Sequence, residues 1–143
     1  FLFLIILIFL QIIFGAFVSG LDAGKIYQTW PLMGNTFFPD DLTVSNLENI
    51  FEFNNHSLIQ FYHRSLAYLI LLYVIFLSIY IYKKKFHTLY NSLNILLILL
   101  IVQILLGIFT LISGLNIFLA SAHQITSVLL IFSALNLYYL RTK

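Results

Sequence analysis

Long apolar runs alternate with polar segments along the chain, and each apolar run is long enough to cross a membrane as a helix. A spanning helix needs about 20 predominantly apolar residues. The stretches that meet this length are residues 1–19, 58–82, 93–112 and 117–140. The connections between them are unequal: 20–57 is long and polar, 83–92 is short and basic, and 113–116 is a tight turn. This pattern predicts an all-α membrane protein, a four-transmembrane-helix up-down-up-down bundle with a long outer loop between the first two helices.

The composition excludes several other classes of protein. The sequence is 62% hydrophobic and only 8% charged, so a water-soluble globule could not solvate its surface. A net charge of +2 gives no basic stripe for nucleic acid, and we expect no nucleic-acid partner. The lack of cysteine excludes zinc–thiolate and iron–sulfur sites. Because Phe1 stands inside an apolar run without an initiator Met, we expect residues 1–143 to be one bundle of a longer protein.

The charged residues separate by side, which predicts the orientation in the membrane. The acidic residues all lie in the long loop, and they are Asp22, Asp40, Asp41, Glu48 and Glu52. Five of the seven basic residues lie at the opposite helix ends, and they are Lys83, Lys84, Lys85, Arg141 and Lys143. Lys and Arg near span ends stay on the cytoplasmic side. We therefore expect a multi-pass membrane protein with the loop on the outer side and both termini in the cytoplasm or matrix. The richness in Ile, Asn and Lys without Cys favours a bacterial inner membrane, with the loop periplasmic, over a mitochondrial one.

The long loop carries aromatic residues that distinguish it from an ordinary linker. Tyr27, Trp30, Phe37 and Phe38 lie within it. Because disordered linkers are poor in aromatic residues, we favour a lid packed over the outer end of the bundle over a solvated linker.

A short motif occurs twice and relates the two halves of the chain. Residues 11–17 and 103–109 share the pattern Q-I-x-x-G-x-F, and each copy is followed by Ser-Gly-Leu. The second and fourth spans each place one histidine near the outward end, His63 and His123. The sequence thus indicates a helical hairpin used twice, with a long loop in the first copy and a short one in the second.

The repeat places the two histidines at matching depth. At 1.5 Å per residue, each imidazole lies roughly 9–11 Å below the start of its helix. The second and fourth helices of such a bundle are diagonal neighbours about 11–14 Å apart, which lets two imidazoles face one metal ion. Gly15 and Gly107 fall near the same level, where a missing side chain leaves room for a flat ligand. These features favour a haem held by His63 and His123.

Other interpretations of these residues stay open at this point. The histidines could form a proton relay or be hydrogen-bonded parts of the structure. The glycines could be close-packing positions, and Gln11 and Gln103 could provide interhelical hydrogen bonds. Arg64 could extend to a lipid headgroup or pair with a haem propionate; with a haem bound, we expect the propionate contact, which makes Arg64 a cofactor-binding residue.

Several motifs together resemble the second half of heme A synthase. They are Gly15-Ala16-Phe17-Val18, Gly20-Leu21-Asp22-Ala23-Gly24, Tyr27, Thr29-Trp30-Pro31-Leu32-Met33-Gly34, Gln60-Phe61, His63-Arg64 with Ala67-Tyr68, Leu106-Gly107-Ile108, and Ala122-His123-Gln124. The resemblance implies an eight-helix protein of two four-helix bundles that oxidises a methyl group of heme O to the formyl group of heme A. It also implies that the second bundle holds haem b, with His63 and His123 as its axial ligands.

One position departs from the pattern of the family's first, substrate-holding bundle. That bundle carries a Glu three residues before its His-Arg pair, and this chain has Gln60 there. Since an amide cannot act as a carboxylate base, we expect a cofactor half without catalytic residues, whose haem transfers electrons. The resemblance implies the N-terminal bundle, heme O and the lipid bilayer as partners, with heme O synthase or a second copy of the chain as further candidates. Taken alone, this half is expected to be inactive.

Two further functional hypotheses come from other classes of protein. The chain could be a haem-binding electron-transfer subunit of a respiratory complex, or a haem-free membrane interaction module with structural histidines.

Overall fold

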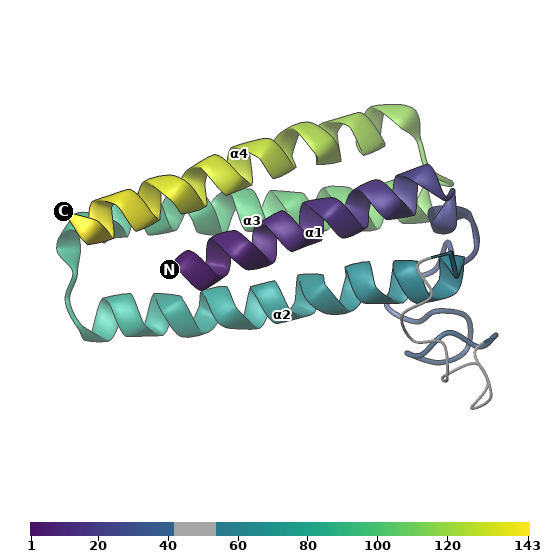
Figure 1. Cartoon of the computed structure of the whole chain (residues 1–143), viewed down its shortest axis with the longest axis horizontal. Coiled ribbons are helices and arrows are strands. Elements are labelled where there is room, and N and C mark those ends of the chain that lie inside the picture. Colours follow the sequence, from purple (N-terminus) through teal and green to yellow (C-terminus); the bar gives the residue numbers. More distant parts are fainter. Residues whose placement is uncertain (42–53) are drawn as a thin grey trace.

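The computed structural model describes residues 1–41 and 54–143, and all long elements in them are helices (Figure 1). The long helices are α1 (Leu2–Gly20), α2 (His56–Lys83), α3 (Tyr90–Ile112) and α4 (Ile117–Thr142). Two short 3-10 helices, η1 (Ala23–Lys25) and η3 (His87–Leu89), lie in the connections. All four long helices have the length and apolar character of membrane spans. The predicted all-α fold with four spans is therefore confirmed.

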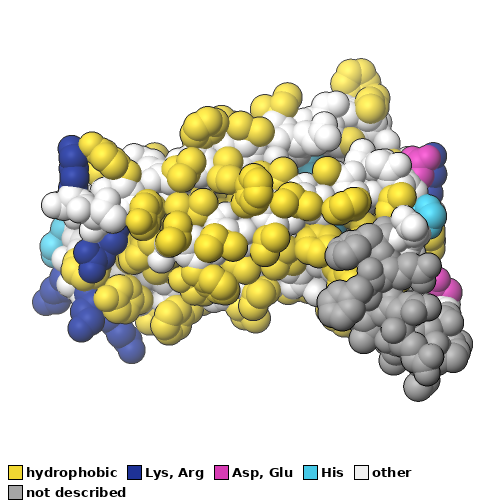
Figure 2. Space-filling view, viewed as in Figure 1, with side chains coloured by type: hydrophobic (Ala, Val, Ile, Leu, Met, Phe, Trp, Pro, Cys, Tyr) yellow, Lys and Arg dark blue, Asp and Glu magenta, His cyan; other side chains and the backbone are white. Residues whose placement is uncertain are grey.

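The helices form a ring in which each contacts its neighbour in sequence. α1 packs on α2, α2 on α3, α3 on α4, and α4 closes the ring against α1. This order leaves α2 and α4 across a diagonal, as an up-down-up-down bundle requires. We call the end with the α2–α3 connection the basic end, and the opposite end, with the α1–α2 loop and the α3–α4 turn, the loop end. Lys and Arg side chains gather at the basic end, whereas the acidic side chains of the described residues lie at the loop end (Figure 2).

Polar side chains define where two of the spans begin. The Asn55 side chain accepts a hydrogen bond from the backbone N–H of Leu58 and so caps α2. Asn116 caps α4 in the same way, after a turn in which Gly114 has a φ of +70°. Glycine suits that left-handed backbone, which explains the tight reversal between α3 and α4.

Only one half of the bundle is densely packed. The buried apolar core lies toward the basic end and consists of Leu4, Leu7, Ile8, Ile70, Val74, Leu77, Ile81, Leu89, Leu93, Leu96, Leu100, Leu130, Ala134 and Leu137. At the loop end itself, residues 57–60 of α2 are buried, but between them and the core no residue of 11–20, 61–69 or 101–129 is buried. The ribbons of α2 and α4 also diverge toward that end (Figure 1). The loop-end half therefore has a loosely packed interior.

The described part of the long loop folds back onto the loop end. Gly24 of η1 packs so closely on the Leu115 side chain that an added Cβ would lie 2.9 Å from it. The Phe38 ring contacts Phe61 of α2 with centroids 5.0 Å apart, and Ser57 donates a hydrogen bond of 2.7 Å to Asp41. This packing is what the lid interpretation predicts. Of the acidic loop residues, Glu48 and Glu52 lie outside the described residues.

Candidate functional site

The two histidines singled out by the repeat lie in the loosely packed half of the bundle. His63 is in the third turn of α2 and His123 in the second turn of α4, so each is close to the loop end of its helix. Each imidazole contacts the preceding helix of its own hairpin, α1 or α3. The ring order places α2 and α4 across the diagonal of the bundle, so the two histidines lie on opposite helices of the loop-end half. The structure thus brings the residues of the predicted pair to one region.

Each imidazole rests on a glycine of the neighbouring helix. A Cβ added to Gly15 would lie 3.2 Å from Cε1 of His63, and one added to Gly107 would lie 2.9 Å from Cε1 of His123. Ordinary carbon–carbon contacts are about 3.5–4.0 Å, so any larger residue would push the ring away. In this structure, the space left by each glycine is filled by the imidazole. The sequence pattern predicts a flat ligand in that space and does not indicate the glycine–imidazole contact.

The glutamine of each motif copy contacts the same imidazole. Gln11 Nε2 lies 3.4 Å from Nε2 of His63 and donates a 3.0 Å hydrogen bond to the His63 carbonyl. Gln103 Nε2 lies 3.4 Å from Nε2 of His123. An amide NH2 only donates, so in both cases it points at the lone pair of an unprotonated Nε2. The interhelical hydrogen-bonding role expected for these glutamines is observed, with the histidines as their partners.

The Nδ1 atoms of the two imidazole rings have different surroundings. Nδ1 of His123 lies 3.1 Å from the carbonyl oxygen of Gln103, an acceptor that places the ring proton on Nδ1. Thr126 donates to the Gln103 side chain and further restrains this pair. Nδ1 of His63 is buried, and no hydrogen-bond partner for it is found within residues 1–41 and 54–143. The two halves of the site are therefore alike in layout but not equally restrained.

Arg64 and Gln60 point to the outer loop. Arg64 Nη2 donates to the carbonyls of Tyr27 (3.0 Å) and Thr29 (2.9 Å), and Nη1 donates to that of Leu32 (3.3 Å). Gln60 Nε2 donates to the Tyr27 carbonyl at 2.8 Å. Nothing in the sequence pattern indicates these loop contacts, because the partners are backbone atoms of a non-helical segment.

The remaining histidines do not join the site. His56 begins α2 at the loop end and is exposed. His87 is exposed in η3 at the basic end, where its ring contacts Tyr90 with centroids 4.9 Å apart. Within the described parts of the chain, no three His, Asp or Glu side chains gather as a metal cluster would require.

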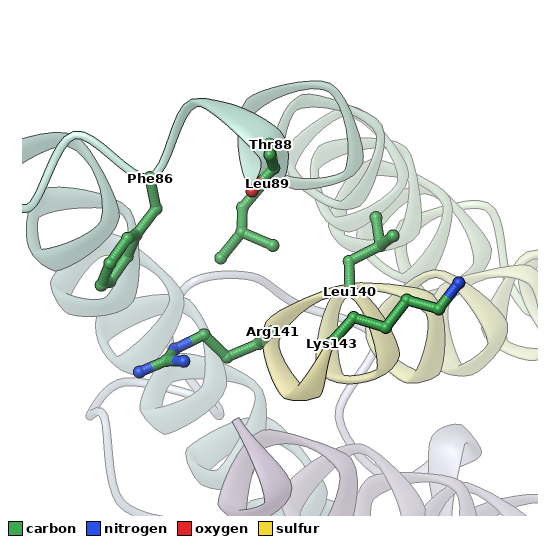
Figure 3. Close-up of a pocket in the computed structure, with 6 residues that line it drawn as sticks. All are labelled: Phe86, Thr88, Leu89, Leu140, Arg141 and Lys143. Carbon is green, nitrogen blue, oxygen red and sulfur yellow. The ribbon is translucent and has the colours of Figure 1, made fainter.

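A pocket at the basic end is remote from His63 and His123 (Figure 3). Its volume is about 200 Å³, and its lining residues are Phe86, Thr88, Leu89, Leu140, Arg141 and Lys143. The Arg141 guanidinium lies 5.0 Å from the centre of the Phe86 ring. Since it has no imidazole, thiolate or carboxylate in its lining, this pocket is not a candidate for metal or haem ligation.

The donor set at the histidines fits a haem. Two imidazoles with unprotonated Nε2 atoms lie in the loosely packed half of the bundle, on the two helices that stand across its diagonal. Haem needs only axial ligands from the protein, because the porphyrin supplies the equatorial nitrogens. A bis-His haem is therefore compatible with the residues present.

Comparison with known proteins identifies the family. The family model described as cytochrome oxidase assembly protein matches residues 1–135. Among curated relatives, the heme A synthase of Pelagibacter ubique is 47% identical over 92% of this chain and 39% of its own length. Those of Wolbachia pipientis wMel and Rickettsia felis are 42% and 39% identical, over 96% and 89% of this chain and 38% and 37% of their own lengths.

The chain thus spans well under half the length of the curated relatives it matches. No solved structure matches it. The match to the family model covers nearly all of the sequence and includes both copies of the glutamine–glycine motif and both histidines. The chain belongs to the heme A synthase family of cytochrome oxidase assembly proteins.

Proposed function

We propose that this chain is the cofactor-binding bundle of a heme A synthase and holds haem b between His63 and His123. The observation that carries the proposal is the matched arrangement on the two hairpins. In each, a glycine receives the imidazole of the neighbouring helix, and a glutamine amide points at its Nε2 atom. A structural role for one histidine would not require the same arrangement on the other hairpin.

The residues of the site would bind, orient and shield the cofactor. Nε2 of each imidazole would bind iron in place of its contact with the glutamine amide. His123 would keep its orientation through the bond from Nδ1 to the Gln103 carbonyl. With both axial positions taken by imidazoles, the haem would supply one-electron transfer and would have no open position for oxygen.

Gln60 supports assignment of the chain to the cofactor half of the enzyme. Its amide donates to the Tyr27 carbonyl, a contact that a carboxylate could not make. In this proposal, oxidation of the heme O methyl group takes place in the other bundle, and no residue of this chain is catalytic. The other bundle, heme O and the lipid bilayer are the partners, and this half has no synthase activity alone. Membership of the heme A synthase family favours this assignment over a respiratory-complex subunit.

The distribution of charge supports an orientation with the basic end in the cytoplasm and the loop end in the periplasm. The basic end carries Lys83–Lys85 and Arg141, and the positive-inside rule places such residues on the cytoplasmic side. The haem site would then lie in the outer leaflet, beneath the loop.

Absorption spectroscopy of the protein purified in detergent tests the ligand assignment. We expect a low-spin haem b spectrum, and we expect His63→Ala and His123→Ala to lose the haem or its low-spin character. His87→Ala is the matched control, because His87 lies at the basic end, and its spectrum should equal that of the wild type. Equal haem content and equal spectra in all three variants would refute the assignment.

A further inference from the structure

A cluster of hydrogen bonds at the loop end ties α2 to the outer loop beside His63. Gln60, which is only 2% exposed, and Arg64 together donate four hydrogen bonds to loop carbonyls, at 2.8–3.3 Å. All the acceptors are backbone oxygens of residues 27–32. Gln60 and Arg64 lie one turn apart on α2, on either side of the His63 position.

The two side chains suit the groups that they contact. Gln60 and Arg64 offer N–H donors to a loop segment that presents carbonyl oxygens. A glutamate at position 60 would place a charged oxygen against the Tyr27 carbonyl. A lysine at position 64 would lack the planar fork that reaches several diverging carbonyls at once. The residue types at both positions are thus matched to holding the loop.

The segment that they hold lies over the loosely packed half of the bundle. It follows η1, which packs on Leu115 in the α3–α4 turn, and it precedes Phe38, which packs on Phe61 of α2. The loop therefore reaches from the α3–α4 hairpin to α2 across the end nearest to His63 and His123. A loop in this position would separate the interior from water on that side.

From this arrangement we infer that Gln60 and Arg64 are positioning residues that latch residues 27–32 as a lid over the haem site and so slow the loss of haem. The inference rests on the proposed function, because it takes the haem to lie between His63 and His123. It gives Arg64 a role through the loop backbone, whereas the sequence argument had considered a haem propionate or a lipid headgroup as its partner.

Two measurements on the haem-loaded protein in detergent test the latch. Hydrogen exchange of the hydrogen-bonded backbone amides that flank this segment, those of Ile26, Met33 and Gly34, reports how firmly the loop is held. Transfer of haem to excess apomyoglobin reports the rate of haem loss. In Gln60→Glu and Arg64→Met we expect faster exchange and haem loss about tenfold faster, which corresponds to ~1.4 kcal/mol. Arg64→Lys should fall between Arg64→Met and the wild type.

Matched variants separate the latch from general damage to the fold. Gln124→Ala is the control, because Gln124 directly follows His123 just as Arg64 directly follows His63. Since Gln124 is exposed, this variant should behave as the wild type. Gln60→Met removes the hydrogen bond without burying a charge, so it tests the latch even if Gln60→Glu fails to fold.

The two measurements give distinct outcomes. Unchanged exchange of the Ile26, Met33 and Gly34 amides in both Gln60→Met and Arg64→Met would overturn the latch. Faster exchange with unchanged haem loss would overturn the lid function. A wild-type protein that binds no haem would refute the proposed function, and hydrogen exchange would then still decide whether Gln60 and Arg64 hold the loop.

Discussion

Among Gly→Ala replacements in the spanning helices, Gly107→Ala should disturb the haem site most. The new Cβ would lie 2.9 Å from Cε1 and 3.4 Å from Nδ1 of His123. An ordinary carbon–carbon contact is about 3.5–4.0 Å, so the ring would have to retreat by roughly 0.6 Å or more. Such a retreat would lengthen the 3.1 Å contact between Nδ1 and the Gln103 carbonyl beyond hydrogen-bond range.

The expected cost follows from these two changes. A lost hydrogen bond costs about 1 kcal/mol, and forced repacking adds roughly 1–3 kcal/mol. Haem titration of the apoprotein should therefore show binding weakened by about 30-fold or more in Gly107→Ala. Electron paramagnetic resonance should show a loss of low-spin signal, because the displaced imidazole would be a poorer ligand.

Two glycines provide the comparison series for this prediction. Gly15→Ala should have a smaller effect, since its Cβ would lie 3.2 Å from Cε1 of His63 and no Nδ1 hydrogen bond would break. Gly20→Ala should have no effect, because no atom lies within 4 Å of its added Cβ. If haem affinity fell equally in all three variants, or fell most in Gly15→Ala, the proposed seating of the imidazoles would be wrong.

Two further predictions concern the glutamines and the loop. Gln11→Leu should weaken haem binding more than Gln103→Leu, by about fivefold or ~1 kcal/mol. Gln11 also donates to the His63 carbonyl, a bond that ligation of Nε2 would leave in place, whereas the bond from His123 to the Gln103 carbonyl does not depend on the Gln103 side chain. The reverse order in a haem titration would contradict this reasoning. Burial raises the pKa of Asp41, but hydrogen bonds from Tyr27 and Ser57 outweigh burial and leave the pKa below its ordinary value of 3.8. A lowered carboxylate pKa contributes stability that is present above the ordinary pKa and is lost as the pH falls through the lowered pKa. Fluorescence of Trp30, the one tryptophan of the sequence, should therefore change only in that acidic range, and Asp41→Asn should abolish the transition. An identical acid transition in Asp41→Asn would show that another group is responsible.

The positions of the spans could be predicted from sequence because lipid leaves the backbone little choice. A run of about 20 apolar residues within a bilayer must satisfy its hydrogen bonds internally, and it does so as a helix. The predicted spans accordingly differ from the observed helices by three residues at most, the largest difference being the start of α3 at Tyr90. The matching depth of His63 and His123 followed from the same regular geometry.

The packing inside the bundle could not be predicted in the same way. Lipid tails are as apolar as a protein core, so buried Leu96 and exposed Ile98 give the same signal in the sequence. Nothing in the pattern indicates that the basic-end half is dense and the loop-end half is loose. The seating of an imidazole on Gly107 depends on side-chain direction, which sequence spacing alone does not fix.

The loop contacts of Arg64 lie beyond sequence reasoning for a different reason. Its partners are carbonyl oxygens of Tyr27, Thr29 and Leu32, and every residue carries such an oxygen. Only the path of the chain brings these three atoms to one guanidinium, and that path has no periodic pattern.

The central claim is that His63 and His123 bind one iron atom from opposite sides. Pulsed electron paramagnetic resonance of the purified haem protein, with ¹⁵N-labelled histidine, counts the imidazole nitrogens coupled to the iron. The account predicts two coupled imidazoles in the wild type and one in His123→Ala if the haem is retained there. A single coupled imidazole in the wild type, or two that persist in both His63→Ala and His123→Ala, would contradict it.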